Sequence, residues 1–430
     1  MAANLDGDLV DISPLTLRAR AVLPDPTRPL SDTFVGPIVD FLARHAAATP
    51  DRPLLVEYPV VNDDTAAGAL DPVTYTYAAI DAAANPTARQ RLYLEVAQPR
   101  AIITLSRAGP LAPDVVDFID NELALKLIIN ALTPLADIPQ LADADTDSPS
   151  VAIHADTFAT LSFTSGSTGI PKGVLGRHVS LTHFTPWMAE TFGLSASDRF
   201  TMLSGIAHDP IQRDVFTPVV LGASIHIPDS AHILTPGALA QWLADSASTV
   251  THLTPAMGQL VTANAVLGPG VHLALSTAFF VGDVLTQRDV LRLQALCSEH
   301  FVTVNMYGTT ETQRAVSYLA IDACPNNMAL RKHVLGAGKG MCDVDLLVLV
   351  QDSAATWRLA AIGELGELFV RSPHLAYGYL GRDDETAKKF LANPFVDQLA
   401  LARQPGDVAP LLRDRMYRTG DLGRFAADGS

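Results

Sequence analysis

The residues with the clearest chemical potential lie in the hydroxyl-rich segment LSFTSGSTGIPKGV, residues 161–174. It contains five Ser and Thr side chains, three glycines and one charged residue, Lys172. Glycine lets backbone amides approach a ligand closely, hydroxyl groups donate hydrogen bonds without adding charge, and a lysine ammonium attracts phosphate. Because the segment overlaps the apolar run FATLSF, we expect a loop that leaves a buried strand and holds a triphosphate.

Two other interpretations of this loop are weaker. A P-loop requires G-x-x-x-x-G-K-[ST], but Lys172 lies six residues after Gly166, with Pro171 before it and Gly173 after it. A flexible Ser/Gly linker would not run directly into Pro-Lys-Gly after a buried strand. A phosphate-binding loop of another kind therefore remains the best interpretation.

Three further motifs follow along the chain. They are NMYGTTETQ at 305–313, GELFVRSPHLAYGYLG at 366–381 and YRTGDLGR at 417–424. Together with TSGSTGIPKG they resemble, in order, the signatures of the adenylate-forming (AMP-binding) enzymes, the superfamily of acyl-CoA synthetases, luciferases and adenylation domains of nonribosomal peptide synthetases. Four ordered matches are not expected by chance, since single motifs are what produce false positives.

A closer resemblance extends beyond these signatures. SGIAHDPIQRDVFTPVVLGASIHIP (204–228), LTPAMGQLVTANA and MYGTTETQRAVSY are similar to the fungal L-2-aminoadipate (α-aminoadipate) reductase family of lysine biosynthesis. That resemblance implies ATP-dependent activation of the δ-carboxylate of 2-aminoadipate as an adenylate. It also implies transfer to a phosphopantetheine carrier domain and reduction with NADPH by a reductase domain.

The resemblance implies a site for ATP and Mg²⁺. Lys172, Thr310 and Glu311 are the expected catalytic residues, with Thr310 and Glu311 as metal ligands. Tyr307 would pack on the adenine and Asp421 would accept hydrogen bonds from the ribose hydroxyls. Without the motifs, Glu311 would be interpreted as a surface glutamate, Tyr307 as a core tyrosine and Asp421 as a turn aspartate. The expected ATP-binding residues are Thr164, Ser165, Gly166, Ser167, Thr168, Gly169, Lys172, Gly282, Asn305, Tyr307, Gly308, Thr309 and Asp421.

The segment HDPIQRD supplies the candidates for substrate selection. His208, Asp209, Arg213 and Asp214 lie within seven positions. A dicarboxylic amino acid needs an anion for its ammonium group and a cation for the carboxylate that is not activated, so Asp209 and Arg213 could serve these roles, with His208 beside them. The alternative is that these charges cap a helix or pair with each other.

Composition limits the possible partners. The net charge of −16 opposes binding to nucleic acid or to an anionic membrane, because the overall field repels phosphate. No apolar run approaches the roughly 18 residues of a membrane span. Three widely spaced cysteines provide neither a disulfide framework nor a zinc cluster, so a cytoplasmic location is expected.

The elements that would position these residues alternate between short apolar strands and helical patterns from 151 to about 330. This alternation predicts an α/β fold with mostly parallel sheets flanked by helices. The resemblance identifies it as the large N-terminal subdomain of adenylate-forming enzymes. We expect an extended tail at 1–35, an α/β core at 36–330 and a smaller β-rich part at 331–430.

The sequence departs from the family at two places. An internal β-α-β region is expected to be missing at the Asn85–Pro86 join, and the chain stops where the small C-terminal subdomain would begin. No Gly-x-Gly-x-x-Gly fingerprint for NADPH occurs in the 430 residues. We therefore expect weak or absent adenylation by this chain alone, and no thioester or aldehyde formation.

Two other functions remain open at this point. The chain could be a catalytically silent ATP/AMP-binding or interaction module, or it could be another acid-CoA ligase or nonribosomal peptide synthetase-like adenylation domain. A nucleotide-binding assay beside pyrophosphate exchange separates the silent module from the enzyme. The charges of HDPIQRD disfavour an apolar acyl tunnel.

Overall fold

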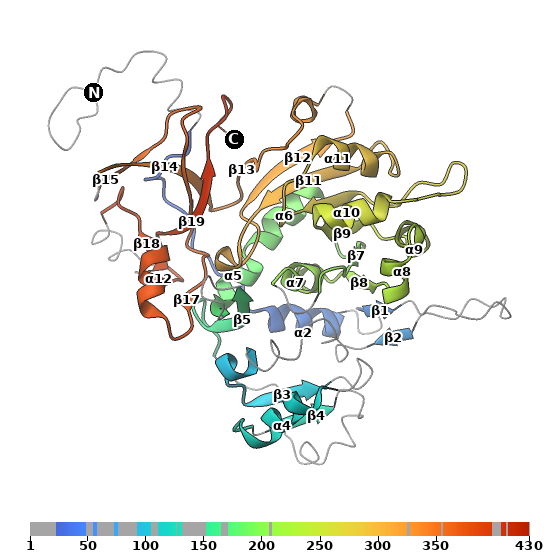
Figure 1. The fold of residues 1–430 in the computed structure, drawn as a ribbon, viewed down its shortest axis with the longest axis horizontal. Coiled ribbons are helices and arrows are strands. Elements are labelled where there is room, and N and C mark those ends of the chain that lie inside the picture. The colour runs from blue at the N-terminus through green and yellow to red at the C-terminus, as the bar shows by residue number, and fades with distance from the viewer. Residues whose placement is uncertain are drawn as a thin grey trace.

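A large, mostly parallel sheet flanked by helices dominates the molecule, and a smaller antiparallel sheet lies beside it (Figure 1). The structure is a computed structural model, and the α/β architecture expected from the sequence is confirmed. It describes residues 23–48, 55–57, 73–75, 93–104, 111–125, 127–130, 152–164, 171–205, 209–324, 327–353, 356–397, 406–409 and 412–429.

Nine strands form the large sheet in the order β13-β12-β11-β10-β9-β7-β8-β1-β2. The pairs from β1 to β11 are parallel, whereas the two ends of the sheet, β1–β2 and β11–β12–β13, are antiparallel. The strands are β1 (Leu55–Glu57), β2 (Val73–Tyr75), β7 (Arg199–Thr201), β8 (Ser224–Ile227), β9 (Val250–Leu253), β10 (Thr277–Phe280), β11 (Val302–Tyr307), β12 (Ser317–Asp322) and β13 (Lys339–Gly340).

Local sequence signals set the ends of the helices that pack on this sheet. α10 begins at Pro255, and the side chain of the preceding Thr254 caps it by accepting a hydrogen bond from the Met257 amide. α7 is capped at its C-terminal end by Gly222, whose φ of 74° suits glycine. These helices are α2 (Ile38–Ala48), α5 (His178–Thr182), α6 (Phe184–Phe192), α7 (Ile211–Leu221), α8 (Ser230–Leu234), α9 (Ala238–Asp245), α10 (Pro255–Thr262) and α11 (Gln287–Gln294).

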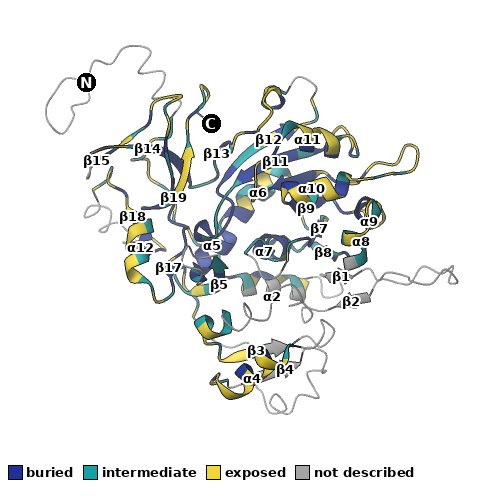
Figure 2. Cartoon of the chain, viewed as in Figure 1, coloured by how far each residue is buried: buried dark blue, intermediate teal, exposed yellow. Residues whose placement is uncertain are grey.

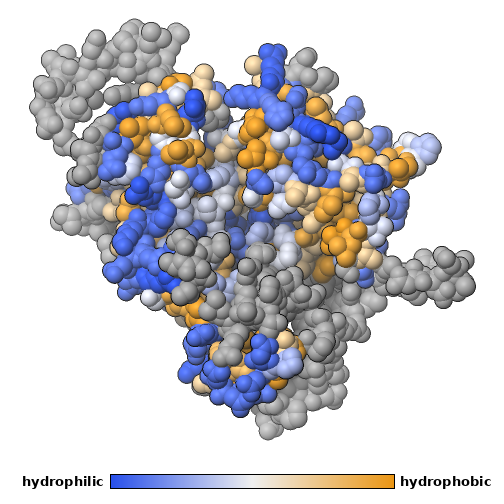
Figure 3. Space-filling view, viewed as in Figure 1, coloured by the Kyte–Doolittle hydropathy of each residue, from blue (hydrophilic) through white to orange (hydrophobic). Residues whose placement is uncertain are grey.

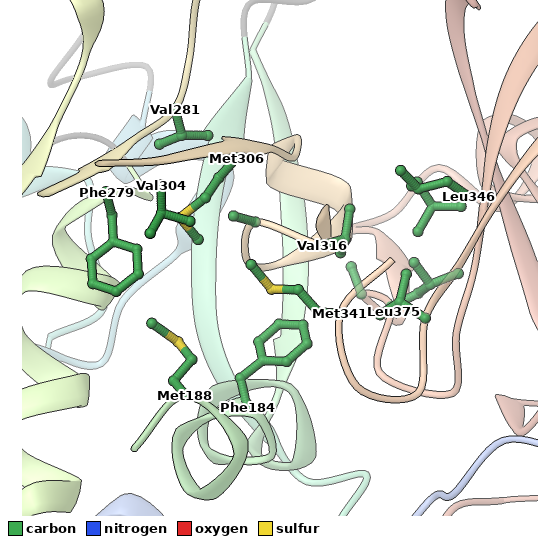
Figure 4. Close-up of a cluster of buried hydrophobic side chains, with 14 of the residues drawn as sticks. Phe184, Met188, Phe279, Val281, Val304, Met306, Val316, Met341, Leu346 and Leu375 are labelled. Atoms are coloured by element: carbon green, nitrogen blue, oxygen red, sulfur yellow. The ribbon is translucent and has the colours of Figure 1, made fainter. Parts of the chain in front are cut away.

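A continuous hydrophobic core joins the large sheet to the rest of the molecule. Met188 of α6 packs with Phe279 and Val304 of adjacent strands, and the same cluster extends to Met341 and Leu375 (Figure 4). Phe279 and Val304 have no exposed surface. Because this core contains residues from both sides of position 330, the two parts of the chain pack as one body.

The smaller sheet is antiparallel throughout, in the order β15-β14-β16-β19-β18. Helix α12 (Asp383–Lys389) lies beside it and has no buried residue, and Figure 2 shows it as a mixture of exposed and intermediate positions. Its acidic first turn and basic last turn match the helix dipole. The strands are β14 (Asp345–Ser353), β15 (Thr356–Leu359), β16 (Gly366–Arg371), β18 (Phe390–Ala392) and β19 (Arg415–Gly423).

A three-stranded sheet carries the hydroxyl-rich loop. β5 (Phe158–Thr164) and β6 (Lys172–Arg177) form an antiparallel hairpin, and β17 (Gly378–Tyr379) pairs with β6. Both β17 and β13 lie after the expected boundary at 330/331, yet they pair with strands that precede it. The boundary at 330/331 therefore stays a prediction.

A small unit lies at the lower end of the view in Figure 1. β3 (Ala101–Thr104) and β4 (Leu127–Asn130) pair in parallel, and α4 (Pro113–Asn121) lies between them in the sequence. Among the described strands, these two pair only with each other. The Asn85–Pro86 join lies outside the described residues.

Residues 23–34 contain no helix or strand but are attached to the β-rich part of the chain. The Arg28 guanidinium contacts Asp345 at 2.8 Å, and the amide of Ser31 donates to Asp343 at 2.8 Å. The amide of Phe34 donates to Asp407. This part of the expected 1–35 tail is thus held in place by residues more than 300 positions away.

The surface in Figure 3 mixes hydrophobic and hydrophilic residues in small patches. Several large apolar side chains are exposed, Leu234 and Val266 among them. Among the helices that the structure describes, none combines the length and the apolar character needed to cross a membrane.

Candidate functional site

The β5–β6 hairpin places the lysine of the hydroxyl-rich segment. Thr164 and Lys172 face each other in register at the open end of the hairpin. The Lys172 ammonium contacts Glu385 of α12 at 2.5 Å and lies 5.3 Å from the ring centre of Tyr379. Ser165, Gly166, Ser167, Thr168 and Gly169 lie outside the described residues.

The carboxyl ends of β10 and β11 lie side by side, because Phe280 and Asn305 are partners in the parallel ladder. Ligands commonly bind beyond the carboxyl ends of parallel strands. Gly282, just after β10, has a φ of 100°, which favours glycine. The Asn305 side chain donates to the carbonyl of Gly336 at 2.8 Å, which anchors this end of β11.

Two residues from different sheets meet at the end of β11. The Tyr307 hydroxyl donates to Asp421 of β19 at 2.5 Å, and Asp421 is exposed to solvent. Burial, followed by this hydrogen bond, raises the pKa of Tyr307. Both residues line a cavity of about 1440 Å³ between the large and the small sheet. Neither Lys172 nor Glu311 lines that cavity, so it covers only one end of the candidate site.

The turn after β11 positions Glu311. Gly308 is required there, because a Cβ would lie 2.6 Å from the carbonyl oxygen of Arg314. Thr309 precedes the short 3-10 helix Thr310–Thr312, and its amide donates to the Thr312 hydroxyl. Glu311 is 8% exposed, and its carboxylate accepts the Tyr379 hydroxyl at 2.8 Å.

The substrate candidate Asp209 adjoins the same turn. The Thr310 hydroxyl donates to the Asp209 carboxylate at 2.9 Å. Burial is the main cause that raises the pKa of Asp209, opposed by the Thr310 hydrogen bond and by the charge of Arg213. The hydroxyl of Thr310, which was expected to bind metal, therefore points to the HDPIQRD segment that carries the substrate candidates. His208 lies outside the described residues.

Arg213 of α7 is a buried cation, only 7% exposed. Burial lowers its pKa, although the charges of Asp214 and Asp209 oppose that change. Among the described residues, no carboxylate lies within 4.0 Å of its guanidinium, and no side chain caps α7. The Asp214 carboxylate accepts the amides of Leu203 and Ser204 instead.

Arg314 is a buried residue near Arg213 that the sequence did not single out. Its guanidinium donates to the Thr217 hydroxyl and to the carbonyl of Leu181. Burial and the nearby charge of Arg213 lower the pKa of Arg314 to about 9. Arg314 thus contacts α7 through Thr217 and lies close enough to Arg213 for the two charges to interact. The only sign of Arg314 in the sequence was its position directly after the NMYGTTETQ motif that contains Glu311.

The residues present fit a Mg²⁺ ion that is shared with a nucleotide. In the described part of the chain, no group of three or more His, Cys, Asp or Glu residues could hold a metal alone. Mg²⁺ typically binds one or two carboxylates together with substrate phosphates and water. The buried carboxylate of Glu311 matches that donor set. Glu311 lies four residues after Tyr307, and Tyr379 contacts both the Glu311 carboxylate and the Lys172 ammonium.

A comparison with protein families decides the classification. The family model described as AMP-binding enzyme matches residues 67–380, which is more than half of the chain. The chain belongs to the AMP-binding enzyme family. The hydroxyl-rich segment, the β11 turn and most of the GELFVRSPHLAYGYLG motif all fall inside the matched range.

Curated relatives of this AMP-binding enzyme extend the match to the whole chain. The L-2-aminoadipate reductases of Schizosaccharomyces pombe and Saccharomyces cerevisiae are 41% and 40% identical over 99% and 98% of the chain. The chain spans about a third of their length, 34% and 35%. These alignments run over 502 and 500 positions although the chain has 430 residues, so the relatives carry additional residues inside the aligned region.

Solved structures show the same fold at low identity. A crystal structure of the nonribosomal peptide synthetase FmoA3 with bound α-methyl-L-serine-AMP has a TM-score of 0.71 at 22% identity. It covers 96% of this chain and 46% of that one. The structure of VinN has a TM-score of 0.67 at 19% identity and covers 92% of this chain and 98% of that one.

Proposed function

We propose that this AMP-binding enzyme activates the carboxylate of an amino acid, L-2-aminoadipate, as an acyl-adenylate at the expense of ATP. The observation that carries the proposal is the hydrogen bond from Thr310 to Asp209. It joins the turn that presents Glu311 to the segment that carries the charges for an amino acid. A nucleotide and a zwitterionic substrate could therefore meet at this point. The aminoadipate reductases among the relatives support this choice of substrate.

The proposed reaction joins two anions, so charge neutralisation and positioning dominate its catalysis. A carboxylate oxygen attacks the α-phosphorus of ATP, and the bond to pyrophosphate breaks with its electron pair leaving on pyrophosphate. Lys172 and the Thr164 hydroxyl would hold the β- and γ-phosphates, while Tyr307 and Asp421 would hold adenine and ribose. When bound at Glu311, Mg²⁺ would neutralise phosphate charge.

Asp209 and Arg213 are proposed to select the amino acid. Asp209 would bind the ammonium group, and Arg213 would bind the carboxylate that is not activated, in a bidentate arrangement. The burial of Arg213 favours an anionic partner, because a desolvated cation gains more from a counter-charge than an exposed one does. Phosphopantetheine loading and NADPH reduction are not proposed for these residues.

Two assays on this chain test the function. With Mg²⁺ present, ATP binding measured by calorimetry should weaken at least about tenfold in Lys172→Ala, because a charge-assisted phosphate contact is lost. Aminoadipate-dependent exchange of labelled pyrophosphate into ATP should be detectable but slower than in the longer relatives. ATP binding without any exchange would favour a silent nucleotide-binding module. Absence of ATP binding would contradict the proposal.

Asp209→Asn should have opposite effects on binding and on stability. Aminoadipate affinity should fall roughly 10- to 100-fold, because the ion pair to the ammonium is lost. The folded-state pKa of Asp209 is raised, so its ionised form is disfavoured in the folded protein. That penalty is absent below the unfolded pKa of 3.8 and complete above the folded pKa. At pH 7 the variant should therefore melt at a higher temperature than the wild type.

Thermal melts of both proteins from pH 3 to 8 check this sign. The difference in melting temperature should grow as pH rises through the folded pKa of Asp209. The asparagine carbonyl oxygen can still accept the Thr310 hydroxyl, so that bond is not the variable. A variant that is less stable at every pH would show that Asp209 supports the fold instead.

A further inference from the structure

We propose that Tyr379 is a positioning residue that holds Glu311 through its hydroxyl and Lys172 through its ring. The inference rests on the proposed function, since it concerns how the metal and the phosphates are bound. Tyr379 lies between the two groups, with its hydroxyl 2.8 Å from the Glu311 carboxylate and the Lys172 ammonium 5.3 Å from its ring centre.

The backbone around Tyr379 is fixed on both sides. In β17, Tyr379 pairs with Val174 of β6, two residues from Lys172. The flanking amides of Tyr377 and Leu380 donate to β6 at Leu175 and Gly173. These bonds make Tyr379 part of the same three-stranded sheet that carries Lys172.

A second contact connects β17 to the turn of Glu311. The amide of Ala376 donates to the carbonyl of Glu311 at 3.0 Å, so backbone and side chain of Glu311 are both held from the β17 segment. Tyr379 itself is 4% exposed, and its ring packs against Phe390 at 5.8 Å. The packed ring leaves the hydroxyl little freedom to move away from the carboxylate.

The two contacts have separable effects. A phenol is a donor at neutral pH, so its hydrogen bond to Oε1 sets the plane of the Glu311 carboxylate and the direction of its second oxygen. Groups that orient a metal ligand in this way typically change metal affinity 10- to 100-fold when removed. The ring face attracts the Lys172 ammonium through a cation–π interaction, which affects phosphate binding without metal.

Two substitutions separate the hydroxyl from the ring. Tyr379→Phe removes only the hydroxyl, and Tyr379→Leu removes both. Tyr377→Phe is the matched control, because Tyr377 is two residues away and 45% exposed. Mn²⁺ binding is measured by electron paramagnetic resonance with saturating β,γ-imido-ATP, and binding of the same nucleotide in EDTA is measured by calorimetry.

In Tyr379→Phe, the Mn²⁺ concentration at half-saturation should rise about tenfold, while nucleotide affinity in EDTA stays within about twofold of the wild type. In Tyr379→Leu, nucleotide affinity in EDTA should fall as well, by about fivefold. Tyr377→Phe should match the wild type in both measurements.

Two results would overturn the assignment while leaving the proposed function intact. In one, Tyr379→Phe binds Mn²⁺ as the wild type does. In the other, it loses nucleotide affinity in EDTA as much as it loses Mn²⁺ affinity, which indicates a general disturbance of the fold. If the wild-type chain binds no β,γ-imido-ATP with Mn²⁺, the proposed function and this inference fall together.

Discussion

Replacing Arg371 by alanine should lower the free energy of unfolding by about 3–5 kcal/mol, because it leaves the buried Asp414 carboxylate without its cation and removes one of the two cations that contact Asp345. Arg371 is 1% exposed at the end of β16. Its guanidinium donates to both carboxylate oxygens of Asp414 at 2.7 Å and to Asp345 at 2.7 Å. Breaking a buried network of this kind costs far more than the loss of an exposed ion pair.

The same substitution should loosen the N-terminal segment. Arg371 donates to the carbonyl of Arg28 at 2.6 Å, and the Arg28 guanidinium contacts Asp345. Residues 23–34 should therefore become accessible to protease under native conditions in the variant. An unchanged free energy of unfolding in Arg371→Ala would contradict the prediction and would show that the network contributes specificity and not stability.

Urea denaturation and limited proteolysis measure these two effects. Arg358→Ala is the control, because Arg358 also forms a two-pronged contact with a carboxylate, that of Glu364, but at the surface. It lies in the same sheet, on β15. Its urea midpoint should change little and its N-terminal segment should stay protected, since exposed pairs are screened by water.

Replacing Arg213 by glutamine should abolish the preference for a substrate with a second carboxylate. L-2-aminoadipate and 5-aminopentanoate share the ammonium group and the carboxylate to be activated, and they differ in the carboxylate assigned to Arg213. The wild type should prefer aminoadipate by roughly 100-fold, because a bidentate charge-assisted contact in a buried site is lost with the analogue. In Arg213→Gln the two affinities should converge.

Competition calorimetry in the presence of ATP and Mg²⁺ measures this preference. Arg292→Gln is the control, because it makes the same replacement at an exposed arginine on α11. The melting temperature of Arg213→Gln should not fall by much, because the structure shows no carboxylate within ion-pair distance of Arg213 among its described neighbours. An unchanged preference in Arg213→Gln would show that another residue binds this carboxylate.

Much of the fold could be read from local patterns. The apolar run FVTVNMY predicts a buried strand and forms β11, and DDETAKK, acidic first and basic last, forms α12. The β-rich character expected after residue 330 corresponds to the antiparallel sheet β15-β14-β16-β19-β18. The motifs also placed candidate residues on loops at strand ends, where the structure has Gly282, Gly308 and Glu311.

The sequence could not show how distant segments share a site. Tyr379 was visible only as a letter in a motif, because nothing local indicates that its hydroxyl reaches Glu311, 68 positions earlier. Likewise, the motifs assigned Tyr307 and Asp421 to one nucleotide, but nothing local shows that the Tyr307 hydroxyl donates to Asp421, 114 positions away. Such pairs depend on which strands become neighbours, and that is decided by the packing of whole sheets.

By itself, then, the sequence determined the family, the α/β class and the chemistry of the loops, because motif spacing and apolar periodicity are local properties of the chain. Only the tertiary structure decided that the Thr310 hydroxyl donates to Asp209 and that the Asp214 carboxylate accepts two backbone amides. It also decided that residues 23–34 are bound to the β-rich part of the chain. These outcomes depend on side-chain direction and on burial, since a carboxylate or guanidinium takes whichever partner the packed fold brings within hydrogen-bond distance.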